Sequence, residues 1–229
     1  MAAPSPDLRL IVITDGRLAA PRAVEDVVRA ALEAGAPAVQ LRDKDATGRE
    51  LFEQAVRLRA LTARFGALLF VNDRLDVALA AGADGVHLGP HDVPLHAARR
   101  AAPRPFLIGV STDDPATAAR AAADGADYIG CGAVFGTRTK ADVGAERIGP
   151  EGVAAVAGAV STPVVAIGGI TPDNASALAG TGAAGVAVIG AVMGAPDPGA
   201  VVRRLLASSP GGAATRTGAA SSAASRSRA

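Results

Sequence analysis

The sequence lacks several features that would place it in a specialised class. Its 229 residues include one cysteine, Cys131, so no intrachain disulfide can form, and we expect a cytoplasmic protein in a reducing environment. The formal net charge is only +1, whereas a nucleic-acid-binding protein normally carries a basic excess. No apolar run is long enough to cross a bilayer, and residues 1–7 lack the cationic and apolar regions of a secretion signal. We therefore expect neither nucleic acid nor a membrane as a partner.

Aromatic residues are also scarce, at 3% of the chain, although 49% of the residues are hydrophobic. The core must therefore be built from Ala, Val, Leu and Ile, whose small side chains suit close packing of helices on a parallel sheet. A chain of this length and composition is expected to form one large domain with its own core.

Short β-branched runs alternate with longer Ala-rich amphipathic runs along the chain. The runs predict strands at 8–15, 38–43, 67–73, 85–89, 106–112, 127–134, 163–170 and 185–192. They predict helices at 23–35, 47–65, 74–82, 94–102, 115–125, 149–160, 174–182 and 198–207. Thr47 and Glu50 have the spacing of a capping box, which predicts where the second helix begins.

Eight strand–helix units in about 200 residues predict a single (β/α)8 TIM barrel, because each strand–helix–strand crossover places its strands parallel. An open doubly wound sheet is the alternative, but it would need a glycine-rich turn after the first strand, and Thr14-Asp15-Gly16-Arg17 is not one. We expect a short extension at 1–7, the catalytic barrel at 8–208 and a disordered tail at 209–229. The tail has no aliphatic residue larger than alanine, so it cannot bury enough surface to fold.

Polar residues occupy every second position of the predicted strand at 38–43 and just beyond it. Gln40, Arg42 and Lys44 would point the same way, and cations in a buried strand need anionic partners. Phosphate groups of a ligand would supply them. The alternative is a strand that runs out into a solvated loop.

Polar residues at the ends of other predicted strands extend this pattern around the mouth of the expected barrel. TIM-barrel enzymes carry their active sites at that mouth. Gly168-Gly169 and Gly190 follow the last two predicted strands and could bind a phosphate through bare amides. Lys140 would join Arg42 and Lys44 in a second anion site, and Asp73 with Asp92 could chelate Mg²⁺. Two anion sites and a metal predict a reaction of two substrates, one of them a diphosphate.

Several of these residues also have purely structural interpretations. Gly168-Gly169 could be a tight turn, and Asp73 could be a surface cap. His87 fits either a hydrogen-bonded core histidine or a site residue, whereas His91 and His96 are expected in solvent. Cys131 is interpreted as an inert buried thiol. Asp15 could complete the site or cap the following turn, and it is left outside the predicted site.

Taken in order, the motifs resemble the thiamine phosphate synthase family from about residue 8 to residue 192. The segments that carry the resemblance are Gln40-Leu41-Arg42-Asp43-Lys44, Asn72-Asp73-Arg74, Val86-His87-Leu88-Gly89 with Asp92, Gly109-Val110-Ser111-Thr112, Asp127-Tyr128-Ile129-Gly130, Phe135-Gly136-Thr137-Arg138-Thr139-Lys140 and Ala166-Ile167-Gly168-Gly169-Ile170. The resemblance implies a transferase that joins hydroxymethylpyrimidine diphosphate to hydroxyethylthiazole phosphate with Mg²⁺, forming a C–N bond and releasing pyrophosphate.

The resemblance also implies a role for each matching residue. Asp73 and Asp92 would hold Mg²⁺; Arg42, Lys44, Asn72 and Lys140 would hold the diphosphate; Gln40 and Ser111 would lie at the pyrimidine; and Thr137, Thr139, Gly168, Gly169, Ile189 and Gly190 would hold the thiazole phosphate. Arg42, Lys44, Ser111 and Lys140 would form the catalytic set. The partners implied are small-molecule substrates, and a homo-oligomer is left open.

The chain departs from the family pattern at four places. Gly190 stands where the family usually has serine, Asp113 where histidine is common and Gly136 where proline is frequent, and Pro90-His91 replaces a polar pair. These changes concern the thiazole phosphate more than the metal or diphosphate.

Three other functions remain as alternatives. A thiazole tautomerase-like paralogue is expected to use the histidine that Asp113 replaces. A sugar-phosphate epimerase or isomerase would not need the second anion site. A non-catalytic thiamine-pathway binding protein would have no need of Asp73 and Asp92.

Overall fold

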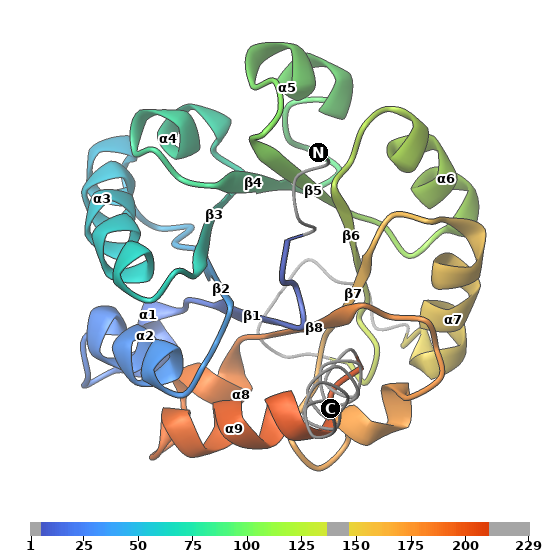
Figure 1. The fold of residues 1–229 in the computed structure, drawn as a ribbon. Helices are drawn as coiled ribbons and strands as arrows, with labels where there is room; N and C mark the ends of the chain where they lie inside the picture. Colours follow the sequence, from blue (N-terminus) through green and yellow to red (C-terminus); the bar gives the residue numbers. More distant parts are fainter. Residues whose placement is uncertain (1–5, 137–146, 211–229) are drawn as a thin grey trace, which may run out of the picture.

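The computed structural model describes residues 6–136 and 147–210, and in these residues eight parallel strands close into a barrel (Figure 1). The strands are β1 (Leu10–Ile13), β2 (Ala38–Leu41), β3 (Leu68–Asn72), β4 (Gly85–Leu88), β5 (Leu107–Ser111), β6 (Tyr128–Cys131), β7 (Val164–Ile167) and β8 (Gly185–Val188). Each strand pairs with the next in sequence, and β1 closes the barrel by pairing Leu10 with Val186 of β8. The predicted TIM barrel is confirmed, and the open sheet is excluded.

Helices form the outer ring of the barrel (Figure 1). They are α1 (Gly16–Ala19), α2 (Val24–Glu33), α3 (Gly48–Arg64), α4 (Leu75–Ala80), α5 (Leu95–Ala101), α6 (Pro115–Ala123), α7 (Gly149–Ala159), the 3₁₀ helix η1 (Ala175–Leu178), α8 (Gly190–Met193) and α9 (Pro198–Ser208). The predicted capping box is present: the Thr47 hydroxyl accepts from the Glu50 amide, and the Glu50 carboxylate accepts from the Thr47 amide. None of the helices in these described residues is long and apolar enough to span a bilayer.

The predicted helices and strands differ from those in the structure mainly in the C-terminal part of the chain. Residues 185–192 were expected to form one strand, but β8 ends at Val188 and α8 begins at Gly190. A short apolar run has no periodicity that separates a strand from a buried helical turn. Only four residues of the predicted helix at 174–182 are helical, as η1. The short helix α1, which Asp15 caps, was not predicted from the sequence.

The barrel interior accommodates two aromatic rings because glycines face them. Tyr128, the one tyrosine of the chain, is 1% exposed and meets Phe70 edge to face, with ring centroids 5.3 Å apart. A Cβ atom at Gly109 would lie 2.1 Å from the Tyr128 ring, and one at Gly85 would lie 2.8 Å from the Phe70 ring. Glycine at these two strand positions is therefore a packing requirement.

Asp127, which directly precedes β6, is the centre of a polar network at the amino ends of the strands. Its side chain is 5% exposed and binds the guanidinium groups of Arg99 and Arg104. It also accepts a 2.7 Å hydrogen bond from the Ile108 amide of β5. This network joins the loops that lead into two neighbouring strands.

Replacing Asp127 with alanine is expected to lower the free energy of unfolding by about 3–5 kcal/mol, because it leaves a buried amide and two cations without their carboxylate. Asp173→Ala is the matched control, since Asp173 pairs with Arg204 at 2.6 Å but is 81% exposed. That change should cost less than about 1 kcal/mol. Urea unfolding of both variants tests the prediction, and equal losses would contradict it.

Candidate functional site

A cavity of about 1070 Å³ opens at the carboxyl ends of the strands. Ten of the predicted site residues line it: Arg42, Lys44, Asn72, Asp73, Asp92, Ser111, Gly168, Gly169, Ile189 and Gly190. The fold therefore gathers residues that lie up to about 150 positions apart in the sequence. Thr137, Thr139 and Lys140 lie outside the described residues.

The loop after β2 brings the first cations to this cavity. The Arg42 backbone is held on both sides by Thr14, whose hydroxyl accepts from the Arg42 amide (2.8 Å) and donates to the Arg42 carbonyl (3.1 Å). The prediction that Gln40, Arg42 and Lys44 form a line of buried polar groups is wrong, because β2 ends at Leu41 and Lys44 is exposed. Of the three side chains only Gln40 is buried, at 3% exposure. The strand thus runs out into a loop, and that loop still lines the cavity.

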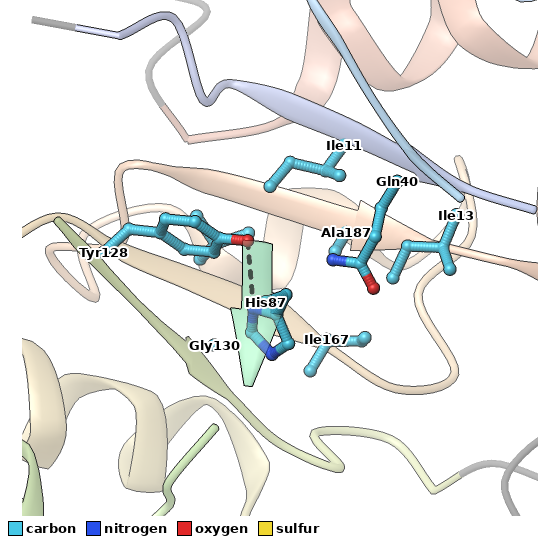
Figure 2. A pocket seen from close by; sticks show the side chains of 9 residues that line it. Ile11, Ile13, Gln40, His87, Tyr128, Gly130, Ile167 and Ala187 are labelled. Atoms are coloured by element: carbon cyan, nitrogen blue, oxygen red, sulfur yellow. Dashed lines mark hydrogen bonds between the residues drawn. The ribbon is translucent and has the colours of Figure 1, made fainter. Parts of the chain in front are cut away.

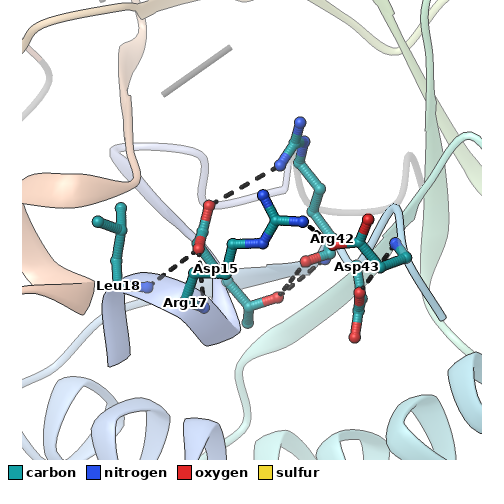
Figure 3. A network of polar contacts seen from close by, with 7 residues as sticks. Asp15, Arg17, Leu18, Arg42 and Asp43 are labelled. Carbon is teal, nitrogen blue, oxygen red and sulfur yellow. Dashed lines mark hydrogen bonds and ion pairs between the residues drawn. The ribbon is translucent and has the colours of Figure 1, made fainter. Parts of the chain in front are cut away.

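The sequence left two roles open for Asp15: completing the site, or capping the following turn. Its carboxylate makes contacts of both kinds (Figure 3). One oxygen accepts hydrogen bonds of 3.1 Å from the amides of Arg17 and Leu18 and so caps α1. The other oxygen lies 4.0 Å from the Arg42 guanidinium, and both side chains are about 14% exposed or less. Asp15 therefore holds Arg42 in a defined position beside the cavity. The sequence signal for the cap was present, but the contact with Arg42 needs the fold.

Asp73 and Asp92 are brought together from the ends of β3 and β4. Among the described residues, Asp73 alone combines a side chain with a positive φ, 65°, a conformation that is strained for residues other than glycine. Asp92 accepts a 2.6 Å hydrogen bond from the Gly89 amide. Burial, then the adjacent Asp92, raises the pKa of Asp73 to about 6, although Lys44 and Arg42 oppose the shift.

This carboxylate pair fits a divalent cation. Two carboxyl groups that are partly desolvated and held in contact repel each other when ionised, and a cation between them relieves that repulsion. Within the described part of the chain no cluster of three or more His, Cys, Asp or Glu side chains could hold a metal. A Mg²⁺ ion held here would therefore take its other ligands from substrate oxygens and water, which is common for this ion.

The opposite wall of the cavity is bare backbone at Gly168 and Gly169. Their φ angles are 106° and 68°, so both require glycine. A Cβ at Gly169 would lie 2.1 Å from the Gly136 carbonyl oxygen, and one at Gly168 would lie 2.7 Å from the Ala133 Cα. Residues 133–136 therefore pack directly on these two glycines, which also line the cavity.

One cation of the cavity, Arg147, was not predicted from the sequence. It is exposed and lines the same cavity as the two glycines. No motif surrounds it in the sequence, so only the fold places it at the site. It gives this wall a positive charge in addition to its amides.

His87 lines the cavity and hydrogen-bonds to a predicted site residue. It is 7% exposed, and its Nδ1 lies 2.9 Å from the Tyr128 hydroxyl (Figure 2). Its Nε2 lies 2.8 Å from the Ser111 hydroxyl. It is therefore a hydrogen-bonded core histidine that also contacts the site. His91 and His96 are exposed, as expected. Cys131 is buried, and desolvation raises its pKa to about 12, in keeping with an inert thiol.

The site can thus hold two anions and a divalent cation in one cavity. Arg42 and Lys44 provide positive charge beside the carboxylate pair, whereas Gly168 and Gly169 offer amides on the other side. Within the described residues, this arrangement suits the departure of an anionic leaving group better than proton abstraction.

Comparison with known proteins points to one family. The family model for thiamine monophosphate synthase matches residues 10–192. The thiamine-phosphate synthase of Methanoculleus marisnigri is 51% identical over 135 residues, which are 59% of this chain and 64% of that protein. The thiamine-phosphate synthase of Chloroflexus aurantiacus is 47% identical over 150 residues, 66% of this chain and 68% of that protein. The first of these alignments thus spans slightly less than two thirds of its relative's length.

Solved structures agree with the sequence comparison. The thiamine phosphate pyrophosphorylase from Pyrococcus furiosus superposes with a TM-score of 0.80 and 47% identity, covering 88% of this chain and 95% of that one. A 3-hexulose-6-phosphate synthase superposes with a TM-score of 0.63 but is only 20% identical, so it shares the fold alone.

Proposed function

Because the chain belongs to the thiamine monophosphate synthase family, we propose that it condenses 4-amino-5-hydroxymethyl-2-methylpyrimidine diphosphate with hydroxyethylthiazole phosphate. The products are thiamine phosphate and pyrophosphate, and the enzyme is a transferase that forms a C–N bond. The observation that carries the proposal is the meeting of Arg42, Asp73 and Asp92 on one wall of a cavity whose other wall is bare backbone. The buried, unpaired Cys131 suits action in the cytoplasm.

The first step breaks the carbon–oxygen bond between the pyrimidine methylene group and the diphosphate. Negative charge builds on the departing pyrophosphate, and the ring's amino group stabilises the pyrimidine cation that remains. Arg42 and Lys44 neutralise the departing charge, and Asn72 donates an amide hydrogen to it. Arg42 suits this role because Asp15 and Thr14 hold it in place before the substrate binds. The proposed role of Lys140 lies outside the described residues.

Asp73 and Asp92 would hold Mg²⁺, which supplies further positive charge to the pyrophosphate when bound. Their own part is to fix the ion's position beside Arg42. Asp92 is oriented by the Gly89 amide, and Asp73 is oriented by its unusual backbone.

The second substrate attacks the pyrimidine carbon with its thiazole nitrogen. Its phosphate would bind the amides of Gly168 and Gly169, with Ile189 and Gly190 at the start of α8 alongside. Thr137 and Thr139 would add hydroxyl groups from outside the described residues. The enzyme's task at this step is to hold the nitrogen close to the carbon, and it requires no strong base.

The tautomerase alternative is not favoured. Position 113, where a tautomerase is expected to have histidine, holds Asp113, which lines the cavity. The proposed diphosphate and metal residues have no use in a reaction of the thiazole phosphate alone.

The direct test of the proposed function uses purified protein with both substrates and Mg²⁺, followed by chromatography of the products. Thiamine phosphate and pyrophosphate should form in equal amounts, and omission of Mg²⁺ should stop the reaction. Absence of thiamine phosphate at micromolar enzyme would refute the proposal.

Replacing Gly169 with alanine is expected to raise KM for the thiazole phosphate about tenfold or more, with a smaller change for the pyrimidine diphosphate. The added methyl group would meet the Gly136 carbonyl, and φ of 68° disfavours alanine. Gly158→Ala is the control, because a Cβ there meets nothing within 4 Å and the residue lies in α7. Steady-state kinetics with each substrate varied in turn would contradict the assignment if both KM values rose equally.

A further inference from the structure

Among the residues that the structure describes, Arg147 is the only charged side chain on the β6–β8 side of the large cavity. The other described residues that line the cavity beside these three strands are glycines and apolar residues, apart from Thr171. Arg42, Asp73 and Asp92 line the cavity after β2, β3 and β4. Strands β3 and β7 lie opposite each other in the closed barrel of eight. Arg147 is therefore across the cavity from the carboxylate pair.

The Arg147 side chain lies against Gly136, which in turn lies against Gly169. A Cβ atom at Gly136 would lie 2.8 Å from Arg147 Nε and 3.5 Å from its Cγ and Cδ atoms. The φ angle of Gly136 is 81°, so its backbone requires glycine as well. The Gly136 carbonyl oxygen would lie 2.1 Å from a Cβ at Gly169. Only the thickness of Gly136 thus separates the arginine side chain from the glycine wall.

Backbone hydrogen bonds fix the segments that carry this arrangement. The Ile148 amide, next to Arg147, donates to the Ala133 carbonyl at 3.1 Å. The Phe135 amide donates to the Gly168 carbonyl at 3.0 Å. The backbone at Arg147 is therefore tied to the end of β7 through the segment 133–136, although the side chain itself is exposed.

No structural ion pair explains the charge of Arg147. Arg42 lies 4.0 Å from Asp15, and Arg17 binds Asp45 at 2.7 Å. Within residues 6–136 and 147–210, no carboxylate forms such a pair with Arg147. The guanidinium can therefore bind an anionic ligand without first leaving another partner.

A phosphate monoester on this side of the cavity needs a positive charge. It carries a charge of roughly −1.5 to −2 at pH 7, and contact with apolar side chains alone would not compensate for its lost hydration. Gly190, which also lines this side, has no side chain to contribute. A guanidinium suits the task because two of its parallel N–H groups can donate to two phosphate oxygens at once.

We propose that Arg147 is a specificity-determining residue that binds the phosphate of the second substrate, and that it thereby selects the phosphorylated thiazole over free hydroxyethylthiazole. Arg147 takes no part in breaking the carbon–oxygen bond, because it lies across the cavity from Asp73 and Asp92. Gly136 provides the space in which the arginine side chain lies. The inference rests on the proposed function for the identity of the substrate.

Replacing Arg147 with alanine is expected to raise KM for hydroxyethylthiazole phosphate about tenfold or more, because a charge-assisted hydrogen-bonded contact is lost. Both kcat and KM for the pyrimidine diphosphate should stay within about threefold of wild type, since the lost contact contributes only to binding of the other substrate. With free hydroxyethylthiazole, kcat/KM should be the same in the two proteins. Arg147→Lys keeps the charge without the fork of donors and should recover part of the loss.

Arg204→Ala is the matched control. Arg204 is also an exposed arginine, but it lies in α9 and its guanidinium binds Asp173 at 2.6 Å. Its replacement should leave both KM values close to wild type. In Arg147→Ala, an equal rise of the two KM values or an unchanged preference for the phosphorylated thiazole would overturn the inference.

Direct binding separates the failure of this inference from the failure of the proposed function. Hydroxyethylthiazole phosphate is titrated calorimetrically into wild type and Arg147→Ala in the presence of Mg²⁺ and pyrophosphate, without turnover. The wild type should bind it at least about tenfold more tightly than the variant, and the free alcohol should bind to both alike. This result without any coupling reaction would refute the proposed function and leave the inference standing. Normal coupling with equal binding by the two proteins would refute the inference alone.

Discussion

Replacing Arg42 with glutamine is expected to lower kcat for the coupling reaction by about 100- to 1000-fold. The proposed reaction depends on neutralising the pyrophosphate as it leaves, and loss of one preorganised charge or donor in such a site typically has an effect of this size. Arg42 is preorganised because its backbone is held by Thr14 and its guanidinium faces Asp15, with only 13% of the side chain exposed. Glutamine keeps a donor but loses the charge.

Arg17→Gln is the control for this prediction. Arg17 lies in α1 on the same side of the barrel, but it is 83% exposed and its guanidinium binds Asp45 at 2.7 Å. Its replacement should change kcat less than about threefold, because exposed ion pairs contribute little. Single-turnover measurement of pyrophosphate release isolates the chemical step. Equal losses in the two variants would show that general positive charge at the rim matters, and not the placement of Arg42.

Replacing Asp73 with asparagine is expected to make the protein more stable and at least about 100-fold less active. Activity falls because the proposed Mg²⁺ site loses one of its two carboxylates. Stability rises because Asp73 and Asp92 no longer repel each other, and asparagine tolerates the positive φ of 65°. A gain of about 1 kcal/mol in the free energy of unfolding would raise Tm by about 2–4 °C in a domain of this size. Such a gain in stability at the expense of activity is common when a functional site is altered.

The stability difference should depend on pH in a defined direction. The pKa of Asp73 is raised to about 6 in the folded protein, mainly by burial, from its usual 3.8. The folded state therefore holds this proton more tightly than the unfolded state, so wild-type stability rises as pH falls from above 6 toward 4. The advantage of Asp73→Asn should be full above pH 7 and shrink below pH 6, where wild-type Asp73 is itself neutral.

Asp113→Asn is the control, because Asp113 lines the same cavity but follows β5, away from the Asp73–Asp92 pair. It should leave both the Mg²⁺ requirement and Tm close to wild type. Thermal unfolding of metal-free protein and titration of activity with Mg²⁺ are the two measurements. A drop in Tm for Asp73→Asn, or an unchanged Mg²⁺ requirement, would show that Asp73 is structural.

Much of the fold could be predicted because its signals are local. The alternation of apolar strands with amphipathic helices depends on residues close in sequence, and so does the capping box at Thr47 and Glu50. The positions at the strand ends could be predicted as well, because a closed parallel barrel must bring all its carboxyl ends to one mouth. Arg42, Asp73 and Asp92 could therefore be grouped from the sequence alone.

Other features depended on contacts that no local pattern contains. The extent of β2 was overestimated, and Lys44 proved exposed, because where a strand stops depends on its neighbours' pairing. The run at 185–192 divides into β8 and α8 because Ile189 leaves the sheet, which an apolar sequence does not reveal. Arg147 belongs to no sequence motif, and it lines the cavity only because of the path that the folded chain takes.

The sequence by itself determined the barrel, its order of strands and the chemical character of its mouth, since these follow from periodicity and from which residues end each strand. Only the tertiary structure decided that Asp15 faces Arg42, that Asp127 joins two loops, and that His87 links Tyr128 to Ser111. Hydrogen bonds and ion pairs act over a few ångströms, so partners from different strands are defined only once the barrel closes.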